Sequence, residues 1–186
     1  MATELVRHRF TIEQFHLLGT AGVIDPACRV ELIEGEVVDM PPIGSGHGGA
    51  VDSVAEMFFD RFRERAIVRV QNPVLLPPNS ELIPDVALLR RREDHYRFAH
   101  PTPEDVLLVV EVSDSTIRTD RGVKAPLYAR RGVVETWVID LDGRAVHVYR
   151  QPSDDGYKVI QTLRPGDLIS PAAFPDTEIP VAAFFG

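Results

Sequence analysis

Two short apolar runs, each with a carboxylate near one end, constrain the fold of this chain more than any other feature. Residues 83–89 carry Asp85 near their start, and residues 106–112 carry Glu111 near their end. Both runs have the length and the aliphatic composition of buried strands. If they pair antiparallel, the start of the first run lies beside the end of the second. The sequence therefore predicts that Asp85 and Glu111 meet at one edge of a sheet.

Two carboxylates at an apolar edge repel each other unless a cation lies between them. Oxygen ligands of this kind suit Mg²⁺ or Mn²⁺. Lys124 follows in the sequence and would add positive charge where a phosphoryl group gains negative charge. Together these residues indicate a metal-dependent phosphodiesterase. The alternatives are a turn role for Asp85, a structural salt bridge from Glu111 to an arginine, and an ordinary surface position for Lys124.

Length and cysteine content limit the other classes. A chain of 186 residues is long enough for one substantial core, so a single domain over residues 1–186 is expected. Cys28 is the only cysteine, which excludes an intramolecular disulfide and a zinc site built from several cysteines. The six histidines show no paired metal-ligand spacing.

The N-terminal residues 1–10 contain no apolar core of a secretory signal, and no apolar stretch is long enough to span a membrane. We therefore expect a cytoplasmic protein without a membrane partner. The formal net charge is −8, whereas proteins that grip nucleic acid usually present a positive field. Any nucleic-acid binding is therefore expected to be weak, with local arginine clusters as its source.

The remaining sequence predicts a mixture of helices and strands. A short helix at residues 10–18 begins with Thr11 and Gln14 in the spacing of a capping box. A glycine- and proline-rich loop is expected at residues 41–49, followed by a helix whose apolar stripe runs from Val51 to Phe62. Further expectations are a hairpin at 30–40, strands at 66–70, 74–76, 135–140, 145–149 and 157–160, and a helix at 120–131.

A set of motifs in a characteristic order runs through most of the chain. It comprises residues 30–36, His47, 84–86, 111–113, Ser115-Thr116, 120–122 with Lys124, Tyr128-Ala129, Gly132-Val133 and 135–140. In this set the chain resembles the Uma2 (DUF820) family of restriction endonuclease-like proteins, within the PD-(D/E)XK nuclease superfamily. The resemblance implies an α+β (α/β) fold, with a mixed β-sheet flanked by helices and the nuclease site at one sheet edge.

The resemblance also implies residue roles. Asp85 and Glu111 would bind the metal together with the backbone carbonyl of Val112. The superfamily usually places a lysine two positions after the second acid, where this chain has Ser113. The Uma2 pattern moves that lysine to the following helix, and Lys124 matches it.

Two further positions match the family with less defined roles. Glu31 matches a recurrent glutamate of the first hairpin, and its alternative is a strand residue that faces solvent. His47 matches a recurrent histidine before the long helix, and its alternative is a solvated loop residue. Pro126 departs from the family pattern, because proline breaks a helix interior but is tolerated in a first turn. The helix is therefore expected to begin near Lys124.

The leading hypothesis is a Mg²⁺-dependent endonuclease that hydrolyses phosphodiester bonds in nucleic acid, with DNA the expected substrate. Asp85 and Glu111 would hold the metal, and Lys124 would steady the attacking water or the pentavalent phosphate. The alternative is a binding or assembly protein that retains the nuclease fold without catalysis. The sequence leaves the oligomeric state open, although a homodimer would suit the cutting of a duplex.

Overall fold

The computed structural model describes residues 6–186, so part of the N-terminal stretch expected to lack a secretory signal lies outside it. The helical segments are α1 (Ile12–Thr20), α2 (Ser45–Phe62), η1 (Pro103–Asp105), α3 (Ile117–Thr119), η2 (Asp120–Lys124), α4 (Ala125–Arg130) and η3 (Val181–Phe184). The strands are β1 (Val30–Ile33), β2 (Glu36–Asp39), β3 (Ile67–Val70), β4 (Val74–Leu76), β5 (Ser80–Leu82), β6 (Val86–Leu89), β7 (Val106–Ser113), β8 (Glu135–Asp140), β9 (Ala145–Ser153), β10 (Gly156–Leu163), β11 (Leu168–Ile169) and β12 (Ile179–Pro180).

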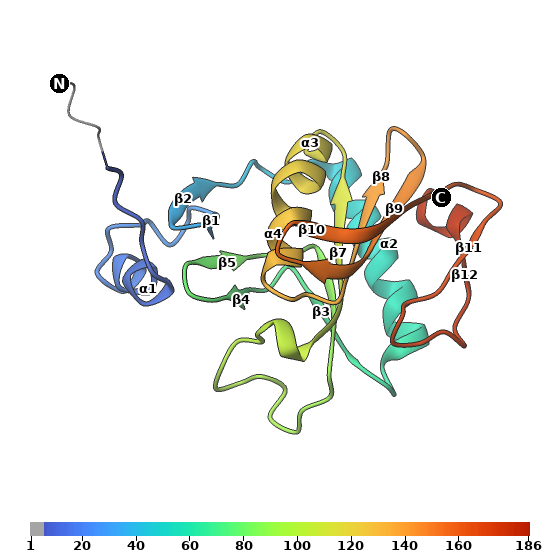
Figure 1. The fold of residues 1–186 in the computed structure, drawn as a ribbon, viewed down its shortest axis with the longest axis horizontal. Helices are drawn as coiled ribbons and strands as arrows, with labels where there is room; N and C mark the ends of the chain where they lie inside the picture. Colours follow the sequence, from blue (N-terminus) through green and yellow to red (C-terminus); the bar gives the residue numbers. More distant parts are fainter. Residues whose placement is uncertain (1–5) are drawn as a thin grey trace.

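A six-stranded sheet forms the centre of the molecule, with strand order β10-β9-β8-β7-β6-β3 (Figure 1). Strands β7 and β8 are parallel and are joined through α3, η2 and α4, whereas the other neighbours are antiparallel. A smaller sheet, ordered β2-β1-β5-β4, lies beside it. This arrangement confirms the expected α+β fold with a mixed sheet and flanking helices.

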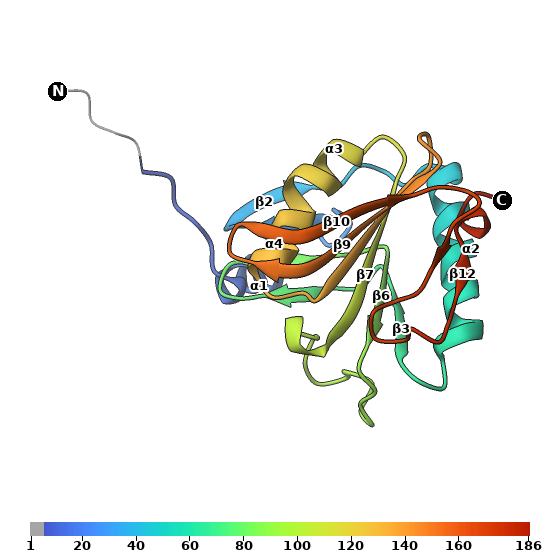
Figure 2. The same ribbon diagram turned by 45° about the vertical axis from the view of Figure 1, so that its right-hand side comes forward.

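Helices cover both faces of the central sheet (Figure 2). On one face α2 packs its stripe, including Phe58 and Phe62, against Trp137 and the C-terminal segment. On the other face α4 packs Leu127 and Tyr128 against the central sheet and against the smaller sheet. None of the helices among the described residues is long and apolar enough to cross a membrane.

The register of β6 and β7 places the two predicted acids opposite each other. The strands pair antiparallel with Val86 opposite Val110, and one further step brings Asp85 opposite Glu111. Since side chains alternate across a strand, and Val86 and Val110 belong to the core under α2, both acids point to the α4 face. The expected strand pairing is therefore confirmed, and it directs both carboxylates to one side.

Several elements agree with their predictions. Thr11 and Gln14 form the expected capping box at the start of α1, with the Thr11 hydroxyl accepting from the Gln14 amide at 3.2 Å. The hairpin of β1 and β2 and the strands β3, β4, β8, β9 and β10 also occur where the sequence indicated strands.

The predicted loop at residues 41–49 is wrong in its second half, because α2 already begins at Ser45. The Gly48 amide donates to the Gly44 carbonyl at 2.9 Å, so the glycine-rich segment forms the first helical turn. Glycine disfavours helix in isolation, but tertiary packing of the long apolar stripe overrides this weak preference.

The helix around Lys124 follows the expectation from Pro126 in part. Helix α4 begins at Ala125, but the helical turns of α3 and η2 precede it. In η2 the Ala125 amide donates to the Asp120 carbonyl, five residues back. This wider turn leads directly into α4, and Pro126 lies in the first turn of α4, after the wider turn.

Candidate active site

Asp85 precedes β6 and lies in a cage of polar contacts. Its Oδ2 accepts a hydrogen bond from the Val112 amide at 2.8 Å, across the β6–β7 pair. Its Oδ1 lies 3.1 Å from both His47 Nε2 and Gln71 Nε2. The side chain is therefore held from three separate segments of the chain, and the turn alternative does not account for these long-range contacts.

Glu111 is more deeply buried than Asp85, with 2% of its surface exposed. Tyr128 donates its hydroxyl proton to Oε1 at 2.8 Å, and Lys124 Nζ lies 3.6 Å from the same oxygen. Burial raises the pKa of Glu111 well above its usual range. Lys124 opposes this shift, and the nearby Asp120, Asp85 and Glu31 add to it. The partner of Glu111 is thus a lysine rather than an arginine.

Lys124 ends η2 and is buried between two carboxylates. Its Nζ donates to Glu31 Oε1 at 3.0 Å, in addition to its contact with Glu111. Burial lowers the pKa of Lys124, but Glu111, Glu31 and Asp120 together raise it above the usual value. The ammonium group therefore stays charged in the folded protein, and the surface alternative for Lys124 is wrong.

Glu31 comes from β1 and joins the small sheet to this cluster. Its Oε1 accepts from the Ile83 amide at 2.8 Å as well as from Lys124. Only 4% of the residue is exposed, so the alternative of a solvent-facing strand residue is wrong.

His47 belongs to the first turn of α2, not to a solvated loop. Its hydrogen bond to Asp85 raises the pKa of His47, burial opposes the shift, and Asp114 and Asp120 raise it further.

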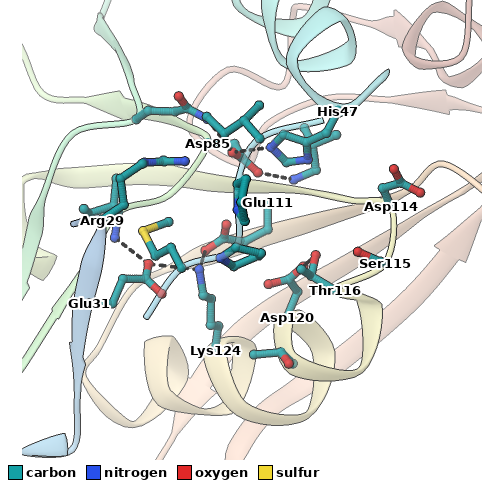
Figure 3. Close-up of a pocket in the computed structure, with 18 of the residues that line it drawn as sticks. Arg29, Glu31, His47, Asp85, Glu111, Asp114, Ser115, Thr116, Asp120 and Lys124 are labelled. Atoms are coloured by element: carbon teal, nitrogen blue, oxygen red, sulfur yellow. Dashed lines mark hydrogen bonds and ion pairs between the residues drawn. The ribbon is translucent and has the colours of Figure 1, made fainter. Parts of the chain in front are cut away.

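One pocket is lined by all five predicted residues together with Val112 (Figure 3): Glu31, His47, Asp85, Glu111 and Lys124. Their catalytic and metal-binding roles stay predictions.

The polar residues of this region to which the sequence interpretation gave no site role include Arg29, Gln71, Asp120 and Tyr128. A signal existed for two of them, because Asp120, Lys124 and Tyr128 follow one another at helical spacing. Asp120 accepts from the hydroxyls of Ser113 and Thr116 at 2.7 and 2.6 Å. Gln71 gave no local signal, since its approach depends on the β3–β6 register and on a positive φ of 47°.

The pocket has a volume of about 350 Å³ and an unbalanced charge. Two cationic side chains line it, Arg29 and Lys124. The carboxylates that line it are Glu31, Asp39, Asp85, Glu111, Asp114 and Asp120. This excess of negative charge in a partly enclosed space favours the binding of a cation.

The oxygen donors of the pocket are of the kind that hard divalent cations take, but their side chains alone do not form a complete ligand set. No group of three or more His, Cys, Asp or Glu side chains placed to hold a metal occurs among residues 6–186, so two carboxylates would need help from backbone or water. Within the same residues Glu111 Oε2 has no hydrogen-bond partner, which leaves it free as a ligand. Oxygen-rich, incompletely closed sites of this kind suit Mg²⁺ or Mn²⁺.

The comparisons with known proteins agree with this architecture. The model of the Uma2 family, described as "Putative restriction endonuclease", matches residues 12–182. A crystal structure described as "a putative nuclease belonging to DUF820", from Anabaena variabilis, is similar with a TM-score of 0.73 and 17% identity. The match covers 95% of this chain and 97% of that chain, and at this identity it establishes a shared fold. A search of curated proteins gives no match. Because the family model spans most of its length, the chain belongs to the Uma2 family.

Proposed function

We propose that this protein is a metal-dependent endonuclease that hydrolyses phosphodiester bonds in nucleic acid, with DNA as the expected substrate. The observation that carries the proposal is the convergence of Asp85, Glu111 and Lys124 in one acidic pocket. The two acids come from opposite positions of adjacent strands, and the lysine comes from the crossover helix. The family description and the shared fold point in the same direction.

Asp85 and Glu111 are the residues that would hold Mg²⁺ or Mn²⁺. The Val112 amide, His47 and Gln71 orient Asp85, while Tyr128 and Lys124 orient Glu111. A bound divalent ion supplies a Lewis acid and lowers the pKa of a water molecule at the site.

Lys124 places a permanent positive charge beside Glu111, close to where a phosphoryl group would gain negative charge. Its hydrogen bond to Glu31 fixes the direction of the ammonium group. Electrostatic stabilisation of this kind is effective because buried charges need no reorganisation during the reaction.

The test is cleavage of supercoiled and linear DNA in the presence of Mg²⁺ or Mn²⁺. The parent should cleave, and Asp85→Ala should lose cleavage and bind Mn²⁺ more weakly in calorimetric titrations. Asp60→Ala is the matched control, because Asp60 lies exposed on α2 and makes no side-chain ion pair among the described residues. Cleavage by Asp85→Ala at the parent rate would remove Asp85 from the mechanism.

One observation favours the alternative of a binding or assembly protein without catalysis. Lys124 is already engaged by two carboxylates and both oxygens of Asp85 are hydrogen-bonded, as in a polar network that stabilises the fold. A parent protein that binds Mn²⁺ and DNA but leaves the DNA intact under all metal conditions would support this alternative.

A further inference from the structure

The two cationic side chains that line the pocket differ in their hydrogen bonds and ion pairs. Lys124 is committed to Glu31 and Glu111, which use much of its donor capacity. Arg29 makes no side-chain hydrogen bond and no ion pair with any of residues 6–186, although the same pocket contains several carboxylates. Arg29 is thus the cation of the pocket with a free guanidinium group.

The backbone of Arg29 is held at the start of the small sheet. It immediately precedes β1, is half-buried, and its carbonyl accepts from the Met40 amide at 2.8 Å. Figure 3 shows Arg29 entering the pocket from the β1 side, whereas Lys124 rises from the helix below. The two cations therefore approach the Asp85–Glu111 pair from different walls.

The chemistry of guanidinium makes this arrangement informative. Arginine stays charged at any physiological pH and presents a planar fork of donors that matches the oxygens of a phosphate. A phosphodiester that enters this pocket meets an excess of carboxylates, so its approach requires positive charge at the pocket wall. An unpaired guanidinium supplies that charge and loses no internal partner when it binds.

We propose that Arg29 binds the non-bridging oxygens of a phosphate of the nucleic acid in the pocket. This inference rests on the proposed function and names the residue that contacts the substrate backbone. The contact is with phosphate, so it carries no base specificity and acts equally on every sequence. Lys124 keeps its proposed place beside Glu111, while Arg29 contacts a phosphate from the β1 side of the pocket.

The experiment measures binding of a fluorescent duplex DNA oligonucleotide by anisotropy as salt is raised. Ca²⁺ replaces Mg²⁺, because it is also a hard cation with oxygen ligands, and gels of the same samples report cleavage. Arg29→Gln should weaken binding on the order of tenfold at low salt, equally for unrelated sequences. The slope of log K against log salt should fall by about one. Arg29→Lys should restore the slope but only part of the affinity, since it keeps the charge without the fork.

Arg97→Gln is the matched control. Arg97 is exposed, also makes no side-chain hydrogen bond or ion pair with the described residues, and lies in the β6–β7 connection, away from the pocket. Its substitution changes the net charge equally and should leave the slope and affinity nearly unchanged. The melting temperature of Arg29→Gln should stay close to that of the parent, because no internal hydrogen bond or ion pair is lost.

The outcomes separate this inference from the proposed function. Equal affinity and slope for Arg29→Gln and the parent would overturn the role of Arg29, even if the parent cleaves DNA. Arg29-dependent binding by a parent that never cleaves would overturn the nuclease proposal alone. A parent that binds no oligonucleotide under any of these conditions would overturn both.

Discussion

Glu111 is a buried carboxylate whose charge is opposed by its surroundings. Burial and the neighbouring acids disfavour ionisation, and Lys124 only partly offsets them. Glu111→Gln keeps the size of the side chain and removes the repulsion, so in metal-free buffer the melting temperature should stay equal or rise. Mg²⁺ affinity, measured by calorimetry, should fall. A clear decrease in melting temperature without metal would identify Glu111 as a structural ion-pair partner.

Glu135 offers the matched control for that experiment. It is also fully buried, but it accepts hydrogen bonds from Arg150, Trp137 and the Ala172 amide, outside the pocket. Glu135→Gln leaves Arg150 without its anionic partner and should lower the melting temperature, because breaking a buried pair strands the remaining charge. The change in melting temperature should therefore be zero or positive for Glu111→Gln and negative for Glu135→Gln.

His147 on β9 should contribute a pH-dependent loss of stability. Burial and Arg121 lower the pKa of His147, Asp140 opposes this, and Arg164 adds to the lowering. Because the folded pKa lies below the unfolded value of about 6.5, protonation favours the unfolded state. Stability should fall as pH decreases through about 6.5 and level off below the folded pKa. Urea unfolding across this range should give a weaker pH dependence for His147→Gln than for the parent.

His8→Gln serves as the control for the histidine experiment, since His8 is exposed. Its pH profile should follow that of the parent. A His147→Gln profile that coincides with both would mean that other groups cause the acid sensitivity.

At the scale of elements, the start of α2 combines His47, a candidate site residue, with a sequence of low helix propensity. Gly46, Gly48 and Gly49 flank His47, and a Cβ at Gly46 or Gly49 would meet no atom within 4 Å. Gly49→Ala should therefore stabilise the protein by about 0.5–1 kcal/mol in urea unfolding, through a lower entropy of the unfolded chain.

Gly35→Ala is the contrasting substitution. Gly35 has a φ of 83°, and an added Cβ would lie 2.7 Å from the Cβ of Arg9. This change should destabilise the hairpin of β1 and β2. If Gly49→Ala were also destabilising, the glycines of α2 would be required by a conformation other than the helical one.

Element prediction succeeded where the local pattern and the tertiary packing agree. The apolar runs of β6 and β7, the capping box at Thr11 and the stripe of α2 each carry a periodic signal. It failed at residues 45–49, where long-range packing outweighs glycine, and at β5, whose three residues become a strand only by pairing with β1 and β4. Asp85 and Glu111 could be proposed because charged residues beside apolar runs are unusual, and Lys124 because it matches the lysine of the Uma2 pattern. Gln71 and Arg29 could not, since their places depend on register between distant segments.

At the scale of the whole molecule, net charge should dominate association with nucleic acid. The formal charge of −8 repels a polyanion, so binding should be weak in EDTA and should strengthen with divalent metal. Anisotropy titrations with and without Mn²⁺ at constant ionic strength measure this effect. Nanomolar affinity in EDTA at physiological salt would contradict it. The single domain over residues 1–186 and the homodimer stay predictions.

The connection between β6 and β7 leaves the sheet at the end opposite to Asp85 and Glu111. The four residues of β6 separate that end from the acids by about 13 Å. The exposed tip around Phe98 shares no lining residue with the pocket. The connection is therefore a suitable insertion point. A reporter domain placed there would project from the end of the sheet opposite the acids, and the pairing of β6 with β7 would still hold Asp85 and Glu111 opposite each other.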